Sequence, residues 1–370
     1  MNLTDKEKNR YSRHLHLDKV GLLGQEKLKA AKVLVIGAGG LGCPVLQYLT
    51  AAGVGTIGII DFDRVDATNL QRQILFTVHD IGDNKAISAK NRLTLLNPHT
   101  KFDVYPEKLT TKNALELFKQ YDIIVDGTDN FSTRYLVNDA CVITNKPLVY
   151  GAIYKFEGQV SVFNYKEGPT YRCLFPEPPK AGSVPNCSDV GVLGVLPGLI
   201  GTQQANEVIK IILDLGVPLS GKLLTYDALN NSFLTLNVNR SEEEIQKVLN
   251  NSADFENIDY DFFCGIDSAK NLQEISKESL KSLLDSDEDF QIVDVRQEYE
   301  QPRIDLSTTV NGQLLVAPLN DLEKYIDQIS KSKKVVVVCQ HGIRSVAAIE
   351  HLKNKYDFKN LINLENGIAS

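Results

Sequence analysis

Short apolar stretches alternate with amphipathic stretches along the first 150 residues of the chain. We expect the amphipathic stretches to form helices and the apolar stretches to form strands, over residues 32–37, 56–61, 101–106, 122–127 and 147–152. Strands that alternate with helices of ~10–15 residues predict a mostly parallel sheet. The fold class expected for this part is therefore α/β, with a Rossmann-like, doubly wound sheet.

The pattern changes after residue 152. Residues 158–165 and 221–238 read as antiparallel strands, and between them lie a Gly/Pro-rich loop and a helix over 199–216. We interpret these segments as an antiparallel extension of the first sheet. The whole of residues 1–240 is then one domain.

A second α/β unit follows a polar, acidic segment. Residues 241–270 lose the regular pattern, which predicts a partly ordered linker. Strand and helix signals alternate again over residues 271–370, a normal length for an independent domain. The chain is therefore expected to hold two α/β domains, the second smaller than the first.

Composition narrows the class of protein. The chain has 370 residues, 43% of them hydrophobic, and its net charge of −7 offers no basic field for direct binding of nucleic acid. We see no signal peptide and no apolar run of the ~18 residues that a membrane span requires. Six scattered cysteines do not suggest a disulfide framework. A cytoplasmic protein with reduced thiols is expected.

A glycine-rich loop, GAGGLG, follows the first apolar strand. Gly37, Gly39 and Gly42 have the spacing of a dinucleotide-binding turn, and a helix that begins near Leu41 would aim its first N–H groups at an anion on the loop. Asp61 ends the next strand, where such folds place a carboxylate on a ribose hydroxyl. By itself, however, this motif is a weak signal.

The polar residues that follow distinguish the site from that of a dehydrogenase. The run NLQRQ at 69–73 places Asn69 and Arg72 close behind the carboxylate, and Lys85 follows in GDNKA. Arg72 and Lys85 can neutralise phosphate charge and stabilise a departing pyrophosphate. Since NAD needs no such cluster, the sequence favours a nucleoside triphosphate.

Asp129 lies just after the strand at 122–127. Ligands bind at the carboxyl ends of parallel strands, and a carboxylate there is a natural Mg²⁺ ligand. The alternative is that Asp129 serves as the N-cap of the helix that follows.

These segments together resemble the MoeB/ThiF-type adenylyltransferases of the ubiquitin-activating superfamily, which activate sulfur-carrier proteins. The matching segments are RYSRH (10–14), GAGGLG (37–42), DFDRVDATNLQRQ (61–73), GDNKA (82–86), TDN (128–130), FEGQVSVF (156–163) and CSDVGVLG (187–194). They occur in order over nearly all of residues 10–240. The resemblance implies that ATP adenylates the C-terminal glycine of a ubiquitin-like carrier protein that ends in Gly-Gly.

The resemblance also implies roles for individual residues. Asp61 would hold the ribose, Asp129 the magnesium, and Arg13 would reach into the ATP site of the partner in a homodimer. The carrier tail would lie along residues 151–160. The implied nucleotide-binding set is Arg13, Gly37, Gly39, Gly40, Gly42, Asp61, Thr68, Asn69, Arg72, Lys85, Asp129 and Asn130.

The chain departs from this family at its metal site. Many relatives hold a structural zinc with two CxxC pairs, one near TYRC and one beyond the last strand. Here the first pair is reduced to Thr170 and Cys173, and the sequence has no second pair. Because Cys173 and Cys264 cannot form a four-thiolate site, we expect no zinc.

Cys187 is the first candidate for sulfur chemistry. It lies in a polar loop, VPNCSDVG, and the matching cysteine of relatives takes part in carrier transfer or in an acyl-disulfide link. A thiol beside a helix start has its thiolate favoured by backbone N–H groups. Cys43 and Cys141 lie in apolar helical contexts, so we interpret them as buried structural residues.

Cys339 is the second candidate. It ends the apolar strand VVVVC and begins the loop CQHGIR, whose backbone N–H groups can surround a thiolate or persulfide, while Arg344 adds fixed charge. With VDVRQEYE (293–300) and NLENGI (363–368), this loop resembles the rhodanese family. A cysteine phosphatase, the competing relative, has five residues between Cys and Arg, whereas this loop has four. An inactive interaction domain is the other alternative.

The two halves together predict a function. Adenylation would activate the carrier, and a persulfide on Cys339 would attack the adenylate, with Cys187 as a candidate for the reductive cleavage that releases a carrier thiocarboxylate. The sulfur donor, a cysteine desulfurase or thiosulfate, and the pathway, molybdopterin, thiamine or tRNA thiolation, stay open. The alternatives are an NAD-dependent oxidoreductase with a regulatory rhodanese domain and a non-catalytic carrier-binding scaffold.

Overall fold

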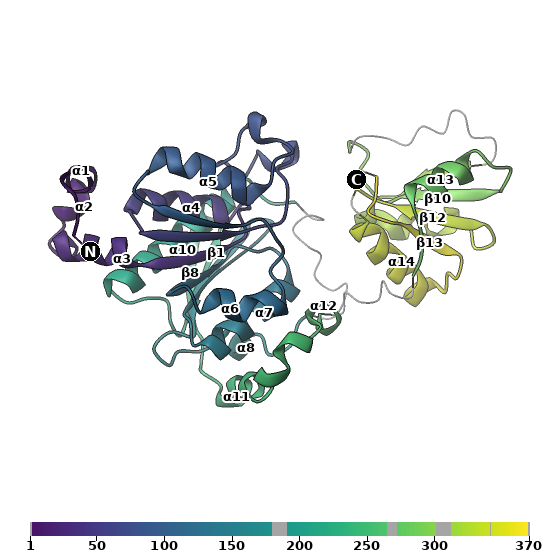
Figure 1. Ribbon diagram of the computed structural model, residues 1–370. Coiled ribbons are helices and arrows are strands. Elements are labelled where there is room, and N and C mark those ends of the chain that lie inside the picture. Colours follow the sequence, from purple (N-terminus) through teal and green to yellow (C-terminus); the bar gives the residue numbers. More distant parts are fainter. Residues whose placement is uncertain (1, 180–190, 265–271, 301–311, 341, 369–370) are drawn as a thin grey trace. The chain divides into compact units, whose positions relative to one another are not determined.

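The computed structural model describes residues 2–179, 191–264, 272–300, 312–340 and 342–368 (Figure 1). Contacts divide the described chain into two compact units, one formed by residues 2–178 and 191–263 and the other mainly by residues 272–368. No described helix is both long enough and apolar enough to cross a membrane.

The first unit is built on an eight-stranded sheet in the order β3-β2-β1-β4-β5-β6-β7-β8. The strands from β3 to β5 are parallel, and those from β6 to β8 continue the sheet in antiparallel pairing. This arrangement confirms the predicted Rossmann-like sheet with its antiparallel extension. The strands are β1 (Lys32–Ile36), β2 (Thr56–Ile60), β3 (Lys101–Tyr105), β4 (Ile123–Asp126), β5 (Leu148–Tyr154), β6 (Glu157–Phe163), β7 (Lys222–Asp227) and β8 (Ser232–Asn237).

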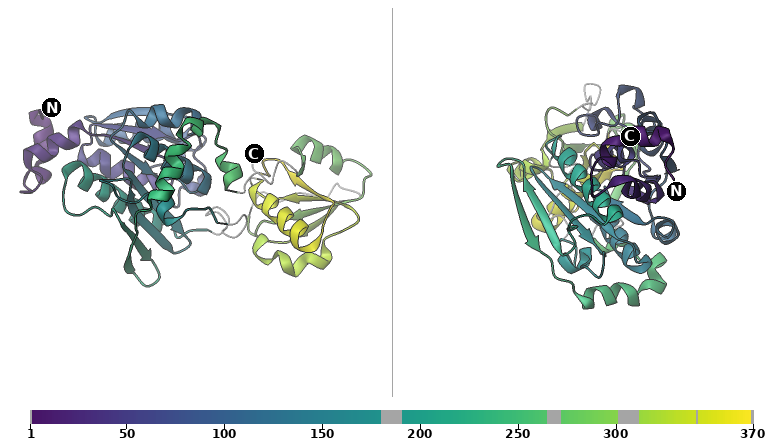
Figure 2. Two further views of the ribbon diagram at one scale, coloured as in Figure 1. Left: turned by 90° about the horizontal axis from the view of Figure 1, so that it is seen from below. Right: turned by 90° about the vertical axis from the view of Figure 1, so that its left-hand side faces the viewer.

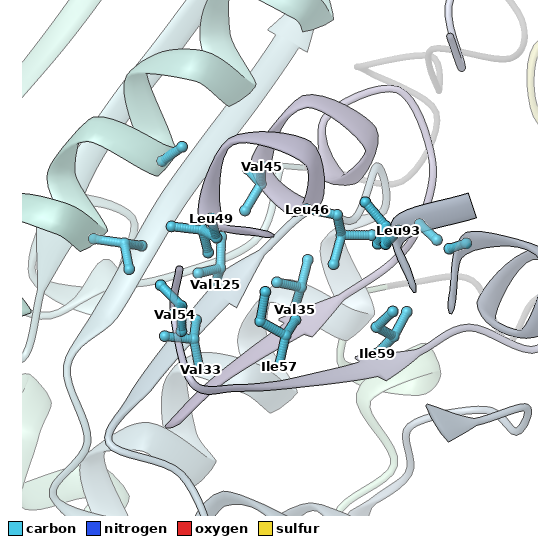
Figure 3. Close-up of a cluster of buried hydrophobic side chains, with 14 of the residues drawn as sticks. Val33, Val35, Val45, Leu46, Leu49, Val54, Ile57, Ile59, Leu93 and Val125 are labelled. Carbon is cyan, nitrogen blue, oxygen red and sulfur yellow. The ribbon is translucent and has the colours of Figure 1, made fainter. Parts of the chain in front are cut away.

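Helices cover both faces of the parallel part of this sheet (Figures 1 and 2). One face packs on α4 (Gly42–Ala52), α5 (Lys85–Leu96) and α10 (Leu196–Leu213). Figure 3 shows this core, in which Val33, Val35, Ile57 and Ile59 of the sheet meet Leu46 and its neighbours on α4. The opposite face carries α6 (Thr111–Phe118) and α7 (Phe131–Thr144).

Three short helices precede the sheet, α1 (Asp5–Arg10), α2 (Ser12–Leu15) and α3 (Gly21–Ala30). Thr4 and Glu7 form a capping box that fixes the start of α1. Tyr11, the residue between α1 and α2 in the chain, is buried, and its hydroxyl accepts a hydrogen bond of 2.8 Å from Asn97 Nδ2. This buried contact ties the N-terminal helices to the end of α5.

The segment predicted as a linker begins as part of the first unit. It forms α11 (Glu242–Asn250), the 3₁₀ helix η3 (Ser252–Asn257) and α12 (Tyr260–Phe263), and both α11 and α12 contact α7. Ile245 and Val248 of α11 are buried against Val142 of α7. Residues 265–271 lie outside the described part of the chain.

A buried ionic cluster attaches α12 to the first unit. Arg172, on the short helix α8 (Tyr171–Leu174), donates two hydrogen bonds of 2.7 and 2.8 Å to the carboxylate of Asp139 on α7. The Tyr260 hydroxyl of α12 donates a third, of 2.7 Å, to the same carboxylate. The Arg172 guanidinium also lies 4.8 Å from the ring centroids of both Tyr135 and Phe263. One carboxylate therefore joins three helices.

The second unit is a five-stranded, fully parallel sheet in the order β11-β10-β12-β13-β9. Its elements are β9 (Gln273–Ile275), α13 (Lys277–Leu284), β10 (Phe290–Asp294), β11 (Gly312–Val316), η5 (Leu319–Gln328), β12 (Lys334–Val338), α14 (Ile343–Tyr356) and β13 (Leu361–Leu364). The sequence did not predict β9, which has only three residues, or β11. The sequence LNDLEKYIDQIS at 319–330 predicts a helix, and the structure has a 3₁₀ helix, η5, over Leu319–Gln328.

We expect Asp139→Ala to destabilise the first unit by about 3–5 kcal/mol, because it leaves the Arg172 cation buried without its partner. Urea unfolding followed by circular dichroism measures this. The control is Glu116→Ala, which breaks the exposed pair with Lys119 and should cost about 1 kcal/mol or less. Equal losses in the two variants would contradict the role given to the cluster.

Candidate functional site

The glycine loop joins the carboxyl end of β1 to α4. Gly37 adopts a φ of +89°, and its N–H donates to Ile60 O at the end of β2, 2.9 Å away. A side chain on Gly42 would place its Cβ 1.9 Å from Gly37 O, so the first turn of α4 packs directly on the loop backbone. The loop therefore lies where the strand order reverses between β1 and β4, the usual ligand site of such sheets.

Two further predicted glycines lie close to other segments. A Cβ on Gly40 would lie 3.1 Å from the Pro197 side chain, at the start of α10. A Cβ on Gly39 would lie 3.7 Å from Nε2 of the buried Gln73. A side chain would therefore be crowded at position 40, whereas at position 39 it would make only an ordinary contact.

Asp61, directly after β2, is bonded to the glycine loop. Its Oδ2 accepts a hydrogen bond of 2.7 Å from Ala38 N, and its Oδ1 accepts one of 2.8 Å from Asp63 N. Burial raises the pKa of Asp61, and the charge of Lys85 opposes that shift. The structure thus brings Asp61 and the glycine loop together, as the sequence predicted.

Lys85 and Arg72 approach the same edge of the sheet. Lys85 Nζ lies 3.0 Å from Asp63 Oδ2, and its side chain is 8% exposed. Arg72 is half-buried, and its Nη1 donates to the carbonyl oxygen of Thr68 at 3.1 Å. Two buried or half-buried cations therefore lie among the carboxylates and glycines of this loop region.

Thr68 and Asn69 make local hydrogen bonds. The Thr68 hydroxyl donates to Asp66 Oδ1 at 2.6 Å, and Asn69 Oδ1 accepts from Asp66 N at 3.1 Å. Both contacts belong to the 3₁₀ turn η1 (Ala67–Asn69). In this structure their side chains shape the turn that carries Arg72.

The N-cap of α7 is Asn130, so the alternative interpretation of Asp129 as that cap is wrong. Asn130 Oδ1 accepts hydrogen bonds from Thr133 N at 2.9 Å and from the Ser132 hydroxyl at 3.1 Å. The Asp129 carboxylate, one residue earlier, is exposed at the carboxyl end of β4. It is therefore available to a cation or ligand.

A buried polar network that the sequence did not reveal supports this loop. Asp126 Oδ1 accepts hydrogen bonds from the backbone N–H and hydroxyl of Thr128, at 2.9 and 2.6 Å. Arg134 Nη2 donates to Thr128 O at 3.3 Å, and Gln204 Nε2 donates to Asp126 O at 2.7 Å. Burial raises the pKa of Asp126, and Arg134 opposes the shift. The loop that carries Asp129 is thus held from both sides.

The remaining predicted positions of this unit are dispersed. Arg13 is exposed on α2, and residues 151–160 form most of the β5–β6 hairpin. Cys187 lies outside the described residues. Cys43 and Cys141 are fully buried, and burial raises the pKa of the Cys43 thiol to about 12 and that of Cys141 well above its usual value. Both are therefore poor nucleophiles.

The region around Cys173 does not fit a zinc site. Cys173 Sγ accepts hydrogen bonds from the backbone N–H groups of Thr170 and Ser241, at 3.3 and 3.2 Å. Thr170 and Ser241 are hydroxyl residues, whereas structural zinc requires thiolate or imidazole ligands. No group of three or more His, Cys, Asp or Glu that could hold a metal occurs among the described residues.

In the second unit, Cys339 directly follows β12 and begins the loop before α14. Its sulfur is buried and accepts a hydrogen bond of 3.1 Å from Gly342 N. Gly342 is the N-cap of α14 and adopts a φ of +84°, which a glycine tolerates. The sulfur therefore lies at a helix N-terminus, as the sequence predicted, where the dipole favours a negative charge.

Two ion pairs lie beside this loop. Arg344 donates to both carboxylate oxygens of Glu300, at 2.8 and 2.6 Å. Burial acts to raise the pKa of Glu300, but the hydrogen bonds from Arg344 outweigh burial and lower that pKa. Arg296, fully buried with Asp294, donates to Gln340 Oε1 at 2.9 Å. The charge expected from Arg344 is therefore partly balanced by Glu300, a pairing that the sequence did not reveal.

Comparisons with known proteins agree with both halves. A model of the ThiF family matches residues 11–247, and a model of the rhodanese-like domain matches residues 276–370. The crystal structure of E. coli MccB with MccA-N7isoASN has a TM-score of 0.57 and 26% identity, and the match covers 65% of this chain and 74% of that one. The structure of MccB with ATP has a TM-score of 0.56, with coverage of 65% and 73%.

Three relatives are similar over most of the chain. A sulfur carrier protein adenylyltransferase of Thermus thermophilus is 50% identical, covering 72% of this chain and 100% of its own length. The probable adenylyltransferase/sulfurtransferase MoeZ of Mycobacterium tuberculosis is 42% identical, covering 100% and 93%. The adenylyltransferase and sulfurtransferase MOCS3 of Culex quinquefasciatus is 43% identical, covering 95% and 83%. The chain therefore belongs to the ThiF family and carries a rhodanese-like domain after its ThiF domain.

Proposed function

We propose that this enzyme adenylates the C-terminal glycine of a ubiquitin-like sulfur carrier and then transfers sulfur to it from Cys339. The observation that carries the proposal is the presence of both sites in one chain. The ThiF domain has a glycine loop with cations beside it, and the rhodanese-like domain has a cysteine at a helix N-terminus. The relatives that match over both domains are named for both activities.

The first unit would bind ATP with its phosphates on the glycine loop. Asp61 would hold the ribose, and Arg72 and Lys85 would neutralise the phosphates, with Lys85 exchanging Asp63 for a phosphate oxygen. The carrier carboxylate would attack the α-phosphorus, so an acyl-adenylate forms and pyrophosphate leaves. This step needs positioning and charge neutralisation rather than a general base.

Asp129 would hold the magnesium ion that accompanies ATP. Mg²⁺ is usually bound by one or two carboxylates together with substrate phosphates and water, and a single exposed carboxylate beside the loop fits that pattern. The ion would add positive charge at the phosphates. The buried pair of Asp126 and Arg134 keeps the Asp129 backbone in place for this role.

A homodimer would complete the adenylation site. Arg13 is exposed on α2, and large apolar side chains nearby are also exposed, Leu17 at 55% and Leu23 at 75%. Burying such side chains against a second copy would be favourable. Arg13 of one protomer would then contact phosphates bound to its partner.

The second unit would supply the sulfur. A donor such as thiosulfate or a cysteine desulfurase first places sulfane sulfur on Cys339. The terminal sulfur of the persulfide then attacks the acyl-adenylate, AMP leaves, and an acyl disulfide joins the carrier to Cys339. A second thiol, for which Cys187 is our candidate, attacks the Cys339 sulfur, so the carrier thiocarboxylate leaves and a disulfide remains for an external thiol to reduce.

We further propose that the chain works without zinc, because the residues that the structure shows bonded to Cys173 Sγ, Thr170 and Ser241, have no thiol. Its hydrogen bonds to α8 and to the start of α11 would take the place of the metal. We favour a carrier of the molybdopterin-synthase type over a thiamine or tRNA-thiolation carrier. Mass spectrometry of proteins that co-purify with the chain would identify it.

Cys339→Ala should abolish formation of carrier thiocarboxylate while sparing ATP–pyrophosphate exchange, because only the second step needs the sulfur atom. Thiocarboxylate is measured by mass spectrometry after incubation of carrier, ATP and thiosulfate. Cys264→Ala, another buried cysteine, serves as the control. Retention of both activities in Cys339→Ala would refute the proposed coupling.

Asp129→Ala should give the reciprocal result. Loss of the magnesium ligand should lower pyrophosphate exchange by ~100-fold or more, in line with the loss of a charge-stabilising group. Sulfur transfer from thiosulfate to cyanide should be unchanged. Asp254→Ala, on the exposed surface of η3, should change neither. Normal exchange in Asp129→Ala would contradict its assignment.

A further inference from the structure

A chain of hydrogen bonds runs from the buried Cys339 sulfur, through the buried Ser345 and Asn363, to the exposed Glu274. Cys339 Sγ lies 3.3 Å from the hydroxyl of Ser345, which is fully buried in the first turn of α14. The Ser345 hydroxyl lies 2.7 Å from Oδ1 of Asn363 on β13. Asn363 Nδ2 in turn lies 2.9 Å from Glu274 Oε1 on β9. Four side chains, from two strands, one helix and the loop after β12, thus form one line.

The chemistry of these groups fixes the direction of each bond. A carboxylate only accepts hydrogen bonds, so Glu274 requires the NH₂ group of Asn363 on its side, and the Asn363 oxygen must face Ser345. An amide oxygen also only accepts, so a bond between Ser345 and Asn363 uses the Ser345 proton, for which Gly342 O, 2.9 Å away, is the other oxygen acceptor. Ser345 has no second proton. Towards Cys339 it can therefore offer only its oxygen, which a protonated thiol satisfies by donating S–H.

We propose that Ser345 is a positioning residue for Cys339 with two settings, and that Asn363 biases it towards the resting thiol. When the sulfur is a thiol, Ser345 donates to Asn363 and accepts from S–H. When the sulfur is an anion, as thiolate or persulfide, the hydroxyl rotates and donates to sulfur. This inference rests on the proposed role of Cys339 as the sulfur carrier of this chain.

The relative strength of the bonds makes both settings accessible. A hydrogen bond to a charged acceptor is roughly twice as strong as a neutral one, so an anionic sulfur can compete with the Asn363 oxygen for the proton. Gly342 O lies 2.9 Å from the same hydroxyl and is a further competing acceptor. Gly342 N donates to the sulfur at 3.1 Å in either setting. Ionisation of Cys339 therefore costs the neutral hydrogen bond that the Ser345 hydroxyl donates to an oxygen acceptor.

The charged groups around this line are mostly paired. Arg344 is bound to Glu300, and Arg296 to Asp294. Both pairs lie on the loop side of Cys339, whereas Glu274 lies at the far end of the line, beyond Asn363. Substitution of Asn363 leaves both ion pairs intact, so its effect on the sulfur should pass through Ser345.

The test uses the full-length chain and the pH dependence of alkylation. The rate at which iodoacetamide modifies Cys339 is followed by mass spectrometry of the peptide that contains it, which separates it from the other cysteines. Asn363→Leu removes one of the two oxygen acceptors of the Ser345 proton, leaving Gly342 O, and so destabilises the thiol setting. The midpoint of the rate profile should fall by about 0.5–1 pH unit, the equivalent of one neutral hydrogen bond.

The decisive comparison is the same substitution without the serine. In the Ser345→Ala background, Asn363→Leu should leave the midpoint unchanged, because the coupling through the hydroxyl is gone. An equal shift in both backgrounds, or no shift in either, would overturn the proposal. Thermal melting checks that the variants fold; should Asn363→Leu not fold, Glu274→Gln, which frees the Asn363 amide to turn over, should lower the midpoint by a smaller amount, and no shift there would also overturn it.

This readout does not depend on sulfur transfer. In protein reduced beforehand with excess thiol, alkylation reports the ionisation of the free Cys339 thiol, whether or not the residue takes up sulfur during turnover. Failure of the proposed function would instead appear as normal thiocarboxylate formation in Cys339→Ala. The two failures are therefore distinguishable.

Discussion

The close approach of Gly42 to Gly37 sets the geometry of the nucleotide site. A Cβ on Gly42 would lie 1.9 Å from the backbone oxygen of Gly37, so α4 can begin at this point only while residue 42 is a glycine. That start places the first free N–H groups of the helix at the reversal point of the sheet. Asp61 bonds to the loop through the N–H of Ala38. Arg72 and Lys85, the two cations of the site, lie later in the chain, before and at the start of α5. In the function we propose, the position of the ATP phosphates depends on this backbone contact.

The rhodanese-like unit builds its site from the same series of elements, a strand, a loop and a helix. A buried parallel strand ends at a loop, a glycine with positive φ lets the chain turn, and a helix begins with its N–H groups towards the ligand. In the first unit the loop would face phosphate in the function we propose, and in the second the Gly342 N–H donates to the Cys339 sulfur. In the second unit the acceptor of the loop N–H is the sulfur of Cys339, a residue of the loop itself.

Much of this could be predicted from the sequence, because strong periodicity and glycine spacing are local signals. The strands β1 to β5, the glycine loop and the Cys339 loop all follow from such signals. What could not be predicted depends on contacts between distant residues. Arg134 reads as an ordinary helical arginine until Asp126 is seen beside it. Tyr260 lies in a polar segment, and nothing local shows that it meets Asp139, 121 residues earlier.

We propose that sulfur carried on Cys339 attacks the carrier adenylate that the ThiF domain forms. A single-turnover experiment tests it most directly. Cys339 is loaded with isotopically labelled sulfane sulfur, free donor is removed, and carrier is added with or without ATP. We expect the label to appear in the carrier's C-terminal thiocarboxylate only when ATP is present. Labelled sulfur that stays on Cys339 while carrier adenylate accumulates would contradict it.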